Sequence, residues 1–167
     1  KFQASVVYCE LTKIINHCLN NSYFPSAWKT ADIITIPKKK GIIEIKDLRP
    51  ISLTSNLGKI LEEVIISRLN SELKEDSIPD FQFGFREEHS TTNAISVLID
   101  KVNTNLNLRK SSALVSLDIK KAFDSVWHGG LTFKLHKSGC SPFTTAVIHS
   151  FLNDRVGNIK LGELKST

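Results

Sequence analysis

An apolar run that ends in a single carboxylate constrains the fold of this chain more than any other feature. In the sequence SSALVSLD, which ends at Asp118, apolar residues occupy both alternating sets of positions between Ala113 and Leu117. This pattern predicts a strand with two mostly apolar faces, as in the centre of a sheet. Because burying an unpaired carboxylate is costly, we expect Asp118 to face water, a basic partner or a metal ion.

The residues around Asp118 have a structural interpretation as well as a functional one. Asp118 can cap the turn that follows it or pair with Lys120 or Lys121, and Phe123 and Trp127 can be ordinary core residues. A short motif taken alone favours this structural interpretation. The rest of the chain therefore decides between the two.

Four stretches that follow one another in the chain resemble the motifs of one enzyme family. They read IITIPKKKG, LRPISLTSNLGKILEEVIISRL, IPDFQFGFREEHSTTNAI and LDIKKAFDSVWHGGLTFKL. In this order, and over nearly the whole chain, they resemble the finger and early palm motifs of reverse transcriptases, in the form used by non-LTR retrotransposons. Leu48 stands where the family usually has an aromatic residue before Arg-Pro, a difference that affects packing more than chemistry.

The chemistry that a polymerase needs, together with the resemblance, gives expected roles to several residues of the aspartate motif. Asp118 and the backbone carbonyl of Ile119 are expected to bind the catalytic Mg²⁺, of which the complete enzyme holds two ions. The backbone amides of Lys121 and Ala122 are expected to hold triphosphate oxygens. Phe123 is expected to lie beneath the sugar, where the family's aromatic residue excludes a ribose 2′-hydroxyl.

Positive charges near residue 40 match the finger residues that hold the incoming nucleotide. Arg49 matches the arginine that grips the triphosphate, since its planar fork suits phosphate oxygens. We expect the accompanying charge to come from one lysine of three: Lys38, Lys39 or Lys40. Lys46 is a substitute for these. The alternatives are a solvated lysine turn and a surface salt bridge between Arg49 and Asp47.

The segment FQFGFREEHSTT combines aromatic rings, a flexible backbone and a positive charge. Aromatic faces and arginine planes stack on bases, and cations follow the phosphate backbone. In the resembled family this region lies along the template and primer, so Gln82, Gly84 and Arg86 are predicted to contact nucleic acid. The alternative, which we expect for two of the three rings, is that they pack on the core: Phe81, Phe83 and Phe85.

Composition agrees with a nucleic-acid partner. The 167 residues are 41% hydrophobic, enough for one core or two small lobes. A net charge of +5 and a pI near 9.1 suit an acidic polymer. The three cysteines form no C-x-x-C pair and indicate buried thiols in a reducing, intracellular compartment. No apolar run reaches about 18 residues, so no membrane span is expected.

The expected fold class is α+β, the fingers and partial palm of a right-hand polymerase with helices around a small antiparallel sheet. Fingers and early palm helices are assigned to residues 1–110, and the N-terminal part of the palm to 111–167. Helical spacing, strand patterns and caps predict these elements in order: a helix ending near Asn20, strands 31–37 and 51–54, a helix capped by Ser55 or Asn56, a helix capped by Ser90, helices 131–137 and 142–153, and a strand or hairpin at 155–167.

The chain begins at Lys1, contains no methionine and stops before the family's paired-aspartate motif, which indicates a segment of a longer polyprotein. We expect an RNA-directed DNA polymerase segment that is inactive alone, whose partners are template RNA, a DNA primer and deoxynucleoside triphosphates. The resemblance also implies action in the nucleus. One alternative is a decayed or repurposed remnant that binds nucleic acid without catalysis. Another is an unrelated helical interaction domain.

Overall fold

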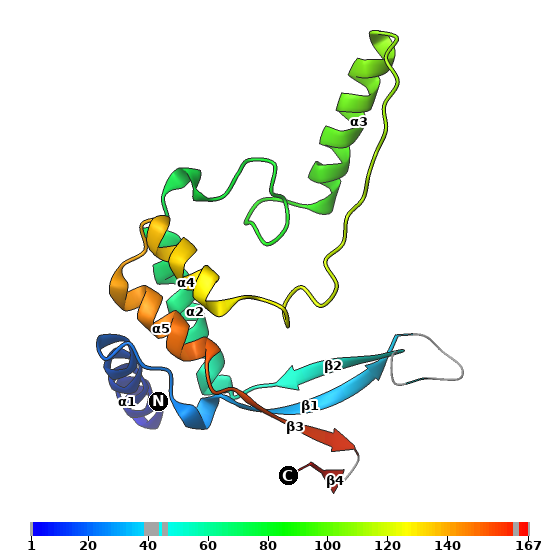
Figure 1. Cartoon of the computed structure of the whole chain (residues 1–167). Coiled ribbons are helices and arrows are strands. Elements are labelled where there is room, and N and C mark those ends of the chain that lie inside the picture. Colours follow the sequence, from blue (N-terminus) through cyan, green and yellow to red (C-terminus); the bar gives the residue numbers. More distant parts are fainter. Residues whose placement is uncertain (1, 39–43, 45–46, 162–163, 167) are drawn as a thin grey trace. The chain divides into compact units, whose positions relative to one another are not determined.

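Helices and one small sheet make up the chain, whose residues divide into two units (Figure 1). The structure is a computed structural model, and it describes residues 2–38, 44, 47–161 and 164–166. Unit 1 contains Lys1–Leu73 and Trp127–Thr167, and unit 2 contains Lys74–Val126. The α+β class is therefore confirmed. These units divide the chain at other residues than the motif-based boundary at 110, and the assignment of fingers and palm stays a prediction.

The hydrophobic core lies in unit 1, among its helices. These are α1 (Phe2–Asn20), α2 (Asn56–Glu72), α4 (His128–Lys137) and α5 (Pro142–Leu152). The buried core cluster comprises eight residues: Ile15, Cys18, Leu19, Phe24, Leu61, Ile65, Val147 and Ile148. At its centre, the fully buried Phe24 ring meets Phe151 edge-on at 5.0 Å between centroids. Three helices and the chain after α1 thus share one core.

The sheet of unit 1 is mixed, which corrects the expected antiparallel sheet. Its strands are β1 (Thr30–Pro37), β2 (Leu48–Leu53), β3 (Val156–Leu161) and β4 (Leu164–Lys165), in the order β2-β1-β3-β4. The predicted hairpin of β1 and β2 is antiparallel, although β2 begins at Leu48 rather than residue 51. β1 and β3 run parallel, and the Val156 amide donates to the Lys29 carbonyl at 3.3 Å. The terminal hairpin is also present.

The predicted helix boundaries lie within three residues of the observed ones. Ser55 occupies the N-cap of α2 but makes no side-chain cap hydrogen bond, and Asn56 is the first helical residue. Ser90 caps α3 (Thr91–Asn107) as predicted, and its hydroxyl accepts from the Asn93 amide. The α4 helix starts three residues earlier than predicted, at His128.

Two of the three cysteines are buried, as the sequence indicated. Burial raises the pKa of the Cys18 and Cys140 thiols. Cys9 is exposed on α1, so the expectation of a buried thiol is wrong for that residue. Among the helices of the described residues, none combines the length and hydropathy of a membrane-crossing segment.

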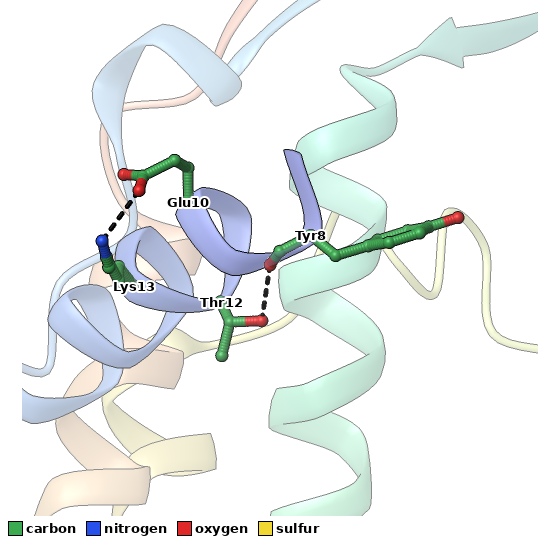
Figure 2. Close-up of polar contacts among 4 residues, drawn as sticks. All are labelled: Tyr8, Glu10, Thr12 and Lys13. Atoms are coloured by element: carbon green, nitrogen blue, oxygen red, sulfur yellow. Dashed lines mark hydrogen bonds and ion pairs between the residues drawn. The ribbon is translucent and has the colours of Figure 1, made fainter. Parts of the chain in front are cut away.

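Four residues near the middle of α1 make contacts within the helix: Tyr8, Glu10, Thr12 and Lys13 (Figure 2). Lys13 Nζ lies 2.7 Å from Glu10 Oε1, and Thr12 Oγ1 donates to the Tyr8 carbonyl at 2.7 Å. Figure 2 shows the Tyr8 ring on the other side of the helix from the ion pair. Val7 and Tyr8 are exposed, whereas Ile15, Cys18 and Leu19 are buried. The core cluster therefore uses residues from the second half of α1.

Unit 2 contains α3, a 3-10 turn at Glu75–Ser77 and extended connections. The predicted buried strand at 113–118 is wrong: residues 111–119 form no strand, and their side chains are exposed, with Leu117 at 91%. A strand needs partners for its amides and carbonyls, and no described strand pairs with this segment. An apolar pattern shows that a segment can form a strand, but it does not show that another strand is available to pair with it.

Candidate functional site

Asp118 presents an open carboxylate. Its side chain is exposed, as the sequence predicted. Within the described part of the chain, this carboxylate has no hydrogen bond and no ion pair with Lys120 or Lys121, and the structure therefore does not show the capping or pairing alternative. The carboxylate remains available to an external cation.

A tight turn follows Asp118. Lys121 adopts a left-handed backbone with φ of 53°, which is uncommon for a residue with a side chain. The Ser125 amide and hydroxyl both donate to the Lys121 carbonyl, at 3.0 and 2.9 Å. Among the described residues, the amides of Lys121 and Ala122 donate to no backbone carbonyl. The turn is thus closed through a carbonyl, and these two amides are left for another acceptor.

Unit 2 brings two predicted site segments together through Phe85 and Phe123. Their ring centroids lie 6.1 Å apart in an edge-to-face arrangement. Both rings are otherwise open, at 96% and 79% exposure. Phe85 also has a left-handed backbone, with φ of 57°. The FQFGF segment therefore contacts the aspartate motif directly.

The expectation that two of the three phenylalanines pack on the core is wrong. Phe81 and Phe85 are exposed, and Phe83 alone is half-buried, with its ring 5.8 Å from that of His89. The core alternative is also wrong for Phe123. The reason is that every buried hydrophobic residue of the described chain belongs to unit 1, so unit 2 has no core of its own to receive the rings.

The three residues predicted to contact nucleic acid lie in one loop of unit 2. Arg86 donates to the Pro79 carbonyl at 3.2 Å and lies 3.5 Å from the Asp80 carboxylate, so its guanidinium closes the loop. The side-chain amide of Gln82 donates from Nε2 to the Gly84 carbonyl at 3.3 Å. A side chain at Gly84 would meet nothing within 4 Å. Their contact with nucleic acid stays a prediction, and Arg86 would have to keep or exchange its internal partners.

The predicted finger cations lie in unit 1. Arg49 is exposed in β2, opposite Ile36 of β1. In the part of the chain that the structure describes, the side chain of Arg49 makes no hydrogen bond or ion pair, so the alternative salt bridge with Asp47 is not formed. Lys38 follows the end of β1, and its amide donates to the Asp47 carbonyl at 2.8 Å. Three predicted or substitute cations lie outside the described residues: Lys39, Lys40 and Lys46.

The predicted metal ligands are Asp118 and the carbonyl of Ile119. The described residues hold no group of three or more His, Cys, Asp and Glu side chains that could bind a metal ion. An exposed carboxylate and a carbonyl are hard oxygen ligands of the kind that Mg²⁺ prefers. These two residues therefore fit part of a magnesium site, and further oxygen ligands are needed to complete it.

Trp127, which the structural alternative assigned to the core, is instead an exposed aromatic residue. It lies at the N-cap of α4 in unit 1, with 79% exposure. A Cβ atom at Gly130 would lie 2.4 Å from Trp127 Cε3, and one at Gly129 would lie 3.1 Å from Nε1. The indole thus rests across two glycines. The signal in the sequence was the pair of glycines directly before the predicted helix at 131–137.

Comparison with known proteins identifies the family. The family model described as "Reverse transcriptase (RNA-dependent DNA polymerase)" matches residues 36–167. The chain is 37% identical over 159 residues to the RNA-directed DNA polymerase from mobile element jockey of Drosophila melanogaster, covering 94% of this chain and 17% of the relative. The jockey polymerase of Drosophila funebris is 41% identical over 147 residues, covering 87% of this chain and 16% of the relative. The probable polymerase from transposon BS of D. melanogaster is 39% identical, with the same coverage.

The chain thus spans about a sixth of the length of these curated relatives. The match to the family model extends over most of the chain, including β2, the FQFGF loop and Asp118. The chain belongs to the reverse transcriptase family, among the polymerases of non-LTR retrotransposons.

Proposed function

We propose that the chain is the finger and early-palm segment of an RNA-directed DNA polymerase that copies an RNA template during retrotransposition. The observation that carries this proposal is the open, unpaired carboxylate of Asp118 in the motif where the family binds its catalytic metal. The relatives are named as RNA-directed DNA polymerases of mobile elements, which supports the same activity. Template RNA, a DNA primer and deoxynucleoside triphosphates are the proposed partners.

Asp118 and the Ile119 carbonyl would hold Mg²⁺ through hard oxygen atoms. Mg²⁺ held there would supply the positive charge that activates a primer hydroxyl and stabilises the leaving oxygen. The free amides of Lys121 and Ala122 bind triphosphate oxygens, and the ring of Phe123 lies beneath the sugar and excludes a 2′-hydroxyl. These residues therefore bind and orient the nucleotide.

The charged and aromatic residues outside this motif complete the proposed binding. The guanidinium of Arg49 grips the triphosphate in a bidentate manner, because its planar donors match phosphate oxygens. A lysine among Lys38, Lys39 and Lys40 adds a second positive charge. The loop of Gln82, Gly84 and Arg86 is proposed to lie along the template and primer.

We further propose that the segment alone does not synthesise DNA. One carboxylate and one carbonyl are too few ligands to hold two magnesium ions firmly. The missing ligands are proposed to come from a paired-aspartate motif in the rest of a longer polyprotein. Priming on chromosomal DNA would require that protein to act in the nucleus.

Primer extension tests the proposal. The 167-residue chain replaces the matching segment of the D. melanogaster jockey polymerase, and DNA synthesis is measured with template RNA, primer, deoxynucleotides and Mg²⁺. We expect the graft to extend the primer and the isolated chain not to. In the graft, Asp118→Asn should lower the rate by more than about 100-fold, since even changes to groups that only orient a metal ligand cost 10–100-fold.

Asp124→Asn is the matched control, because Asp124 is a second exposed carboxylate in the same motif. We expect this variant to keep the rate of the graft within about threefold. Equal losses in the two variants would contradict the assignment of Asp118. An active isolated chain would contradict the proposed need for other ligands, and an inactive graft that still binds RNA would favour the non-catalytic remnant.

A further inference from the structure

The indole ring of Trp127 lies against the first turn of α4. The benzene edge of the ring lies over Gly130, where a Cβ would come within 3.0 Å of three ring atoms, and the pyrrole nitrogen lies over Gly129. Glycine is among the least favourable residues for a helix. The position of the ring accounts for both glycines, since a side chain at Gly130 would displace it. The backbone at Gly129 and Gly130 thus leaves room for the ring to pack directly against it.

The Trp127 ring is still largely exposed. Trp127 keeps 79% of its accessible surface, whereas the chain's other tryptophan, Trp28, is half-buried next to the core, with its ring 6.2 Å from that of Phe24. Tryptophan side chains normally lose most of their surface on folding. The glycines contact one face of the indole, so the opposite face is free to accept a planar partner.

The two helices that follow this ring in the chain carry charge that suits a polyanion. α4 and α5, from His128 to Leu152, contain no Asp or Glu. The same stretch contributes two exposed lysines, Lys134 and Lys137, together with His128, His136 and His149. An aromatic platform followed by cations is the combination that holds single-stranded nucleic acid, because bases stack on the ring and phosphates bind the cations.

We propose that the free face of Trp127 stacks on an unpaired base of single-stranded RNA. This inference rests on the proposed RNA partner and adds a contact beyond the FQFGF loop and the residues proposed to bind the metal ions and the nucleotide. Stacking requires no hydrogen-bonding pattern on the base, so the platform accepts any of the four bases. Gly129 and Gly130 act through Trp127, as positioning residues that fix the plane of the ring.

The test labels the 167-residue chain with 5-fluorotryptophan and follows its two ¹⁹F signals. A fluorescein-labelled 12-nucleotide oligoadenylate RNA is titrated in, and binding is measured by anisotropy. We expect the Trp127 signal, assigned from Trp127→Phe, to shift on binding while the Trp28 signal stays in place. Trp127→Ala should weaken binding about 5- to 100-fold, the usual loss for one stacked base, and Trp127→Phe should recover most of it.

Two matched controls separate stacking from general damage. Gly130→Ala should displace the ring and weaken RNA binding. Gly58 occupies the same position in α2, and a Cβ there would lie 3.4 Å from the nearest Trp28 atom. Gly58→Ala should therefore leave RNA binding unchanged. Phe133→Ala removes another exposed ring from α4 and should change affinity less than twofold.

Three outcomes would contradict the proposed stacking of Trp127 on RNA. These are RNA binding without a shift of the Trp127 signal, unchanged affinity in Trp127→Ala, and no RNA binding by the folded chain. The measurement needs no catalysis, so it can succeed when the Asp118-dependent primer extension fails. The converse also holds, since an active graft with an unshifted Trp127 signal keeps the polymerase proposal and removes this one.

Discussion

Glu72 ties the end of α2 to the start of α5. Its carboxylate accepts hydrogen bonds from the Ser141 amide at 2.8 Å, the Ser141 hydroxyl at 3.1 Å and the Thr144 hydroxyl at 2.8 Å. Partial burial opposes ionisation, but these bonds and the nearby charge of Arg68 outweigh it and lower the pKa of Glu72 below its ordinary value. Folding therefore favours the ionised carboxylate.

We predict that Glu72→Gln destabilises the chain at neutral pH. The amide of glutamine presents donors to donors, so at least one hydrogen bond is lost, which costs about 1 kcal/mol at a site partly open to solvent. Because the folded pKa is the lower one, the contribution of Glu72 is present above the ordinary value of 4.5 and is lost as pH falls below it. Urea unfolding of both proteins, at about pH 7 and about pH 3, measures the difference.

The control for this residue is Glu63→Gln, a change of an exposed glutamate on the same helix. It should leave the free energy of unfolding nearly unchanged at both pH values. A difference between wild type and Glu72→Gln that is as large at about pH 3 as at pH 7 would show that shape, rather than charge, connects the two helices.

At the scale of elements, local patterns predicted the helices well and the strands less well. Caps and 3.6-residue spacing involve residues close in sequence, so the start of α3 after Ser90 and the start of α5 at Pro142 follow from the sequence. The run at 113–118 was predicted as a strand from the same kind of pattern and is not one. The parallel pairing of β1 with β3 joins distant residues and left no local signal.

The stability of α3 depends on its N-cap more than that of α2 does. None of the described α3 side chains is buried, whereas α2 buries Leu61 and Ile65. We predict that Ser90→Ala costs about 0.5–2 kcal/mol of local stability, because the Asn93 amide loses its acceptor. Hydrogen exchange should be faster in the first turns of α3.

Ser55→Ala is the matched change at the N-cap of α2. Ser55 makes no side-chain cap hydrogen bond there, and the helix is held by its buried residues. Its amides should therefore exchange at nearly the wild-type rate. Equal acceleration of exchange in both helices would show that α3 is held by packing of the kind that holds α2.

At the scale of the whole molecule, the sequence predicted the family and the open carboxylate but not the environment of the aromatic residues. Asp118 is exposed because a buried lone charge is costly, and this cost can be judged from the residue alone. The exposure of Phe85 and Trp127 depends on whether a core exists beside them. That property belongs to the complete fold, so residue type could not provide it.

Positive charge is unevenly divided between the two units. Unit 1 contains 15 lysines and arginines against 9 aspartates and glutamates, whereas unit 2 contains 7 against 8. In unit 2, Asp100 adjoins Lys101 in the sequence and Asp80 lies next to Arg86 in the fold. Unit 1 should therefore provide most of the electrostatic attraction for RNA.

We predict that the salt dependence of RNA binding follows this division. Each phosphate contact to a single strand adds about 0.7 to the slope of log affinity against log salt concentration. Lys134, Lys137 and Lys160 are three exposed cations of unit 1. Replacing all three by glutamine should therefore lower the slope by about 1–2. In unit 2, the same replacement of Lys101, Arg109 and Lys110 should change the slope by less than about 0.5. Anisotropy titrations with oligoadenylate RNA at several salt concentrations measure both slopes. Equal losses from the two triple variants would mean that net charge alone, rather than its location in unit 1, attracts the RNA.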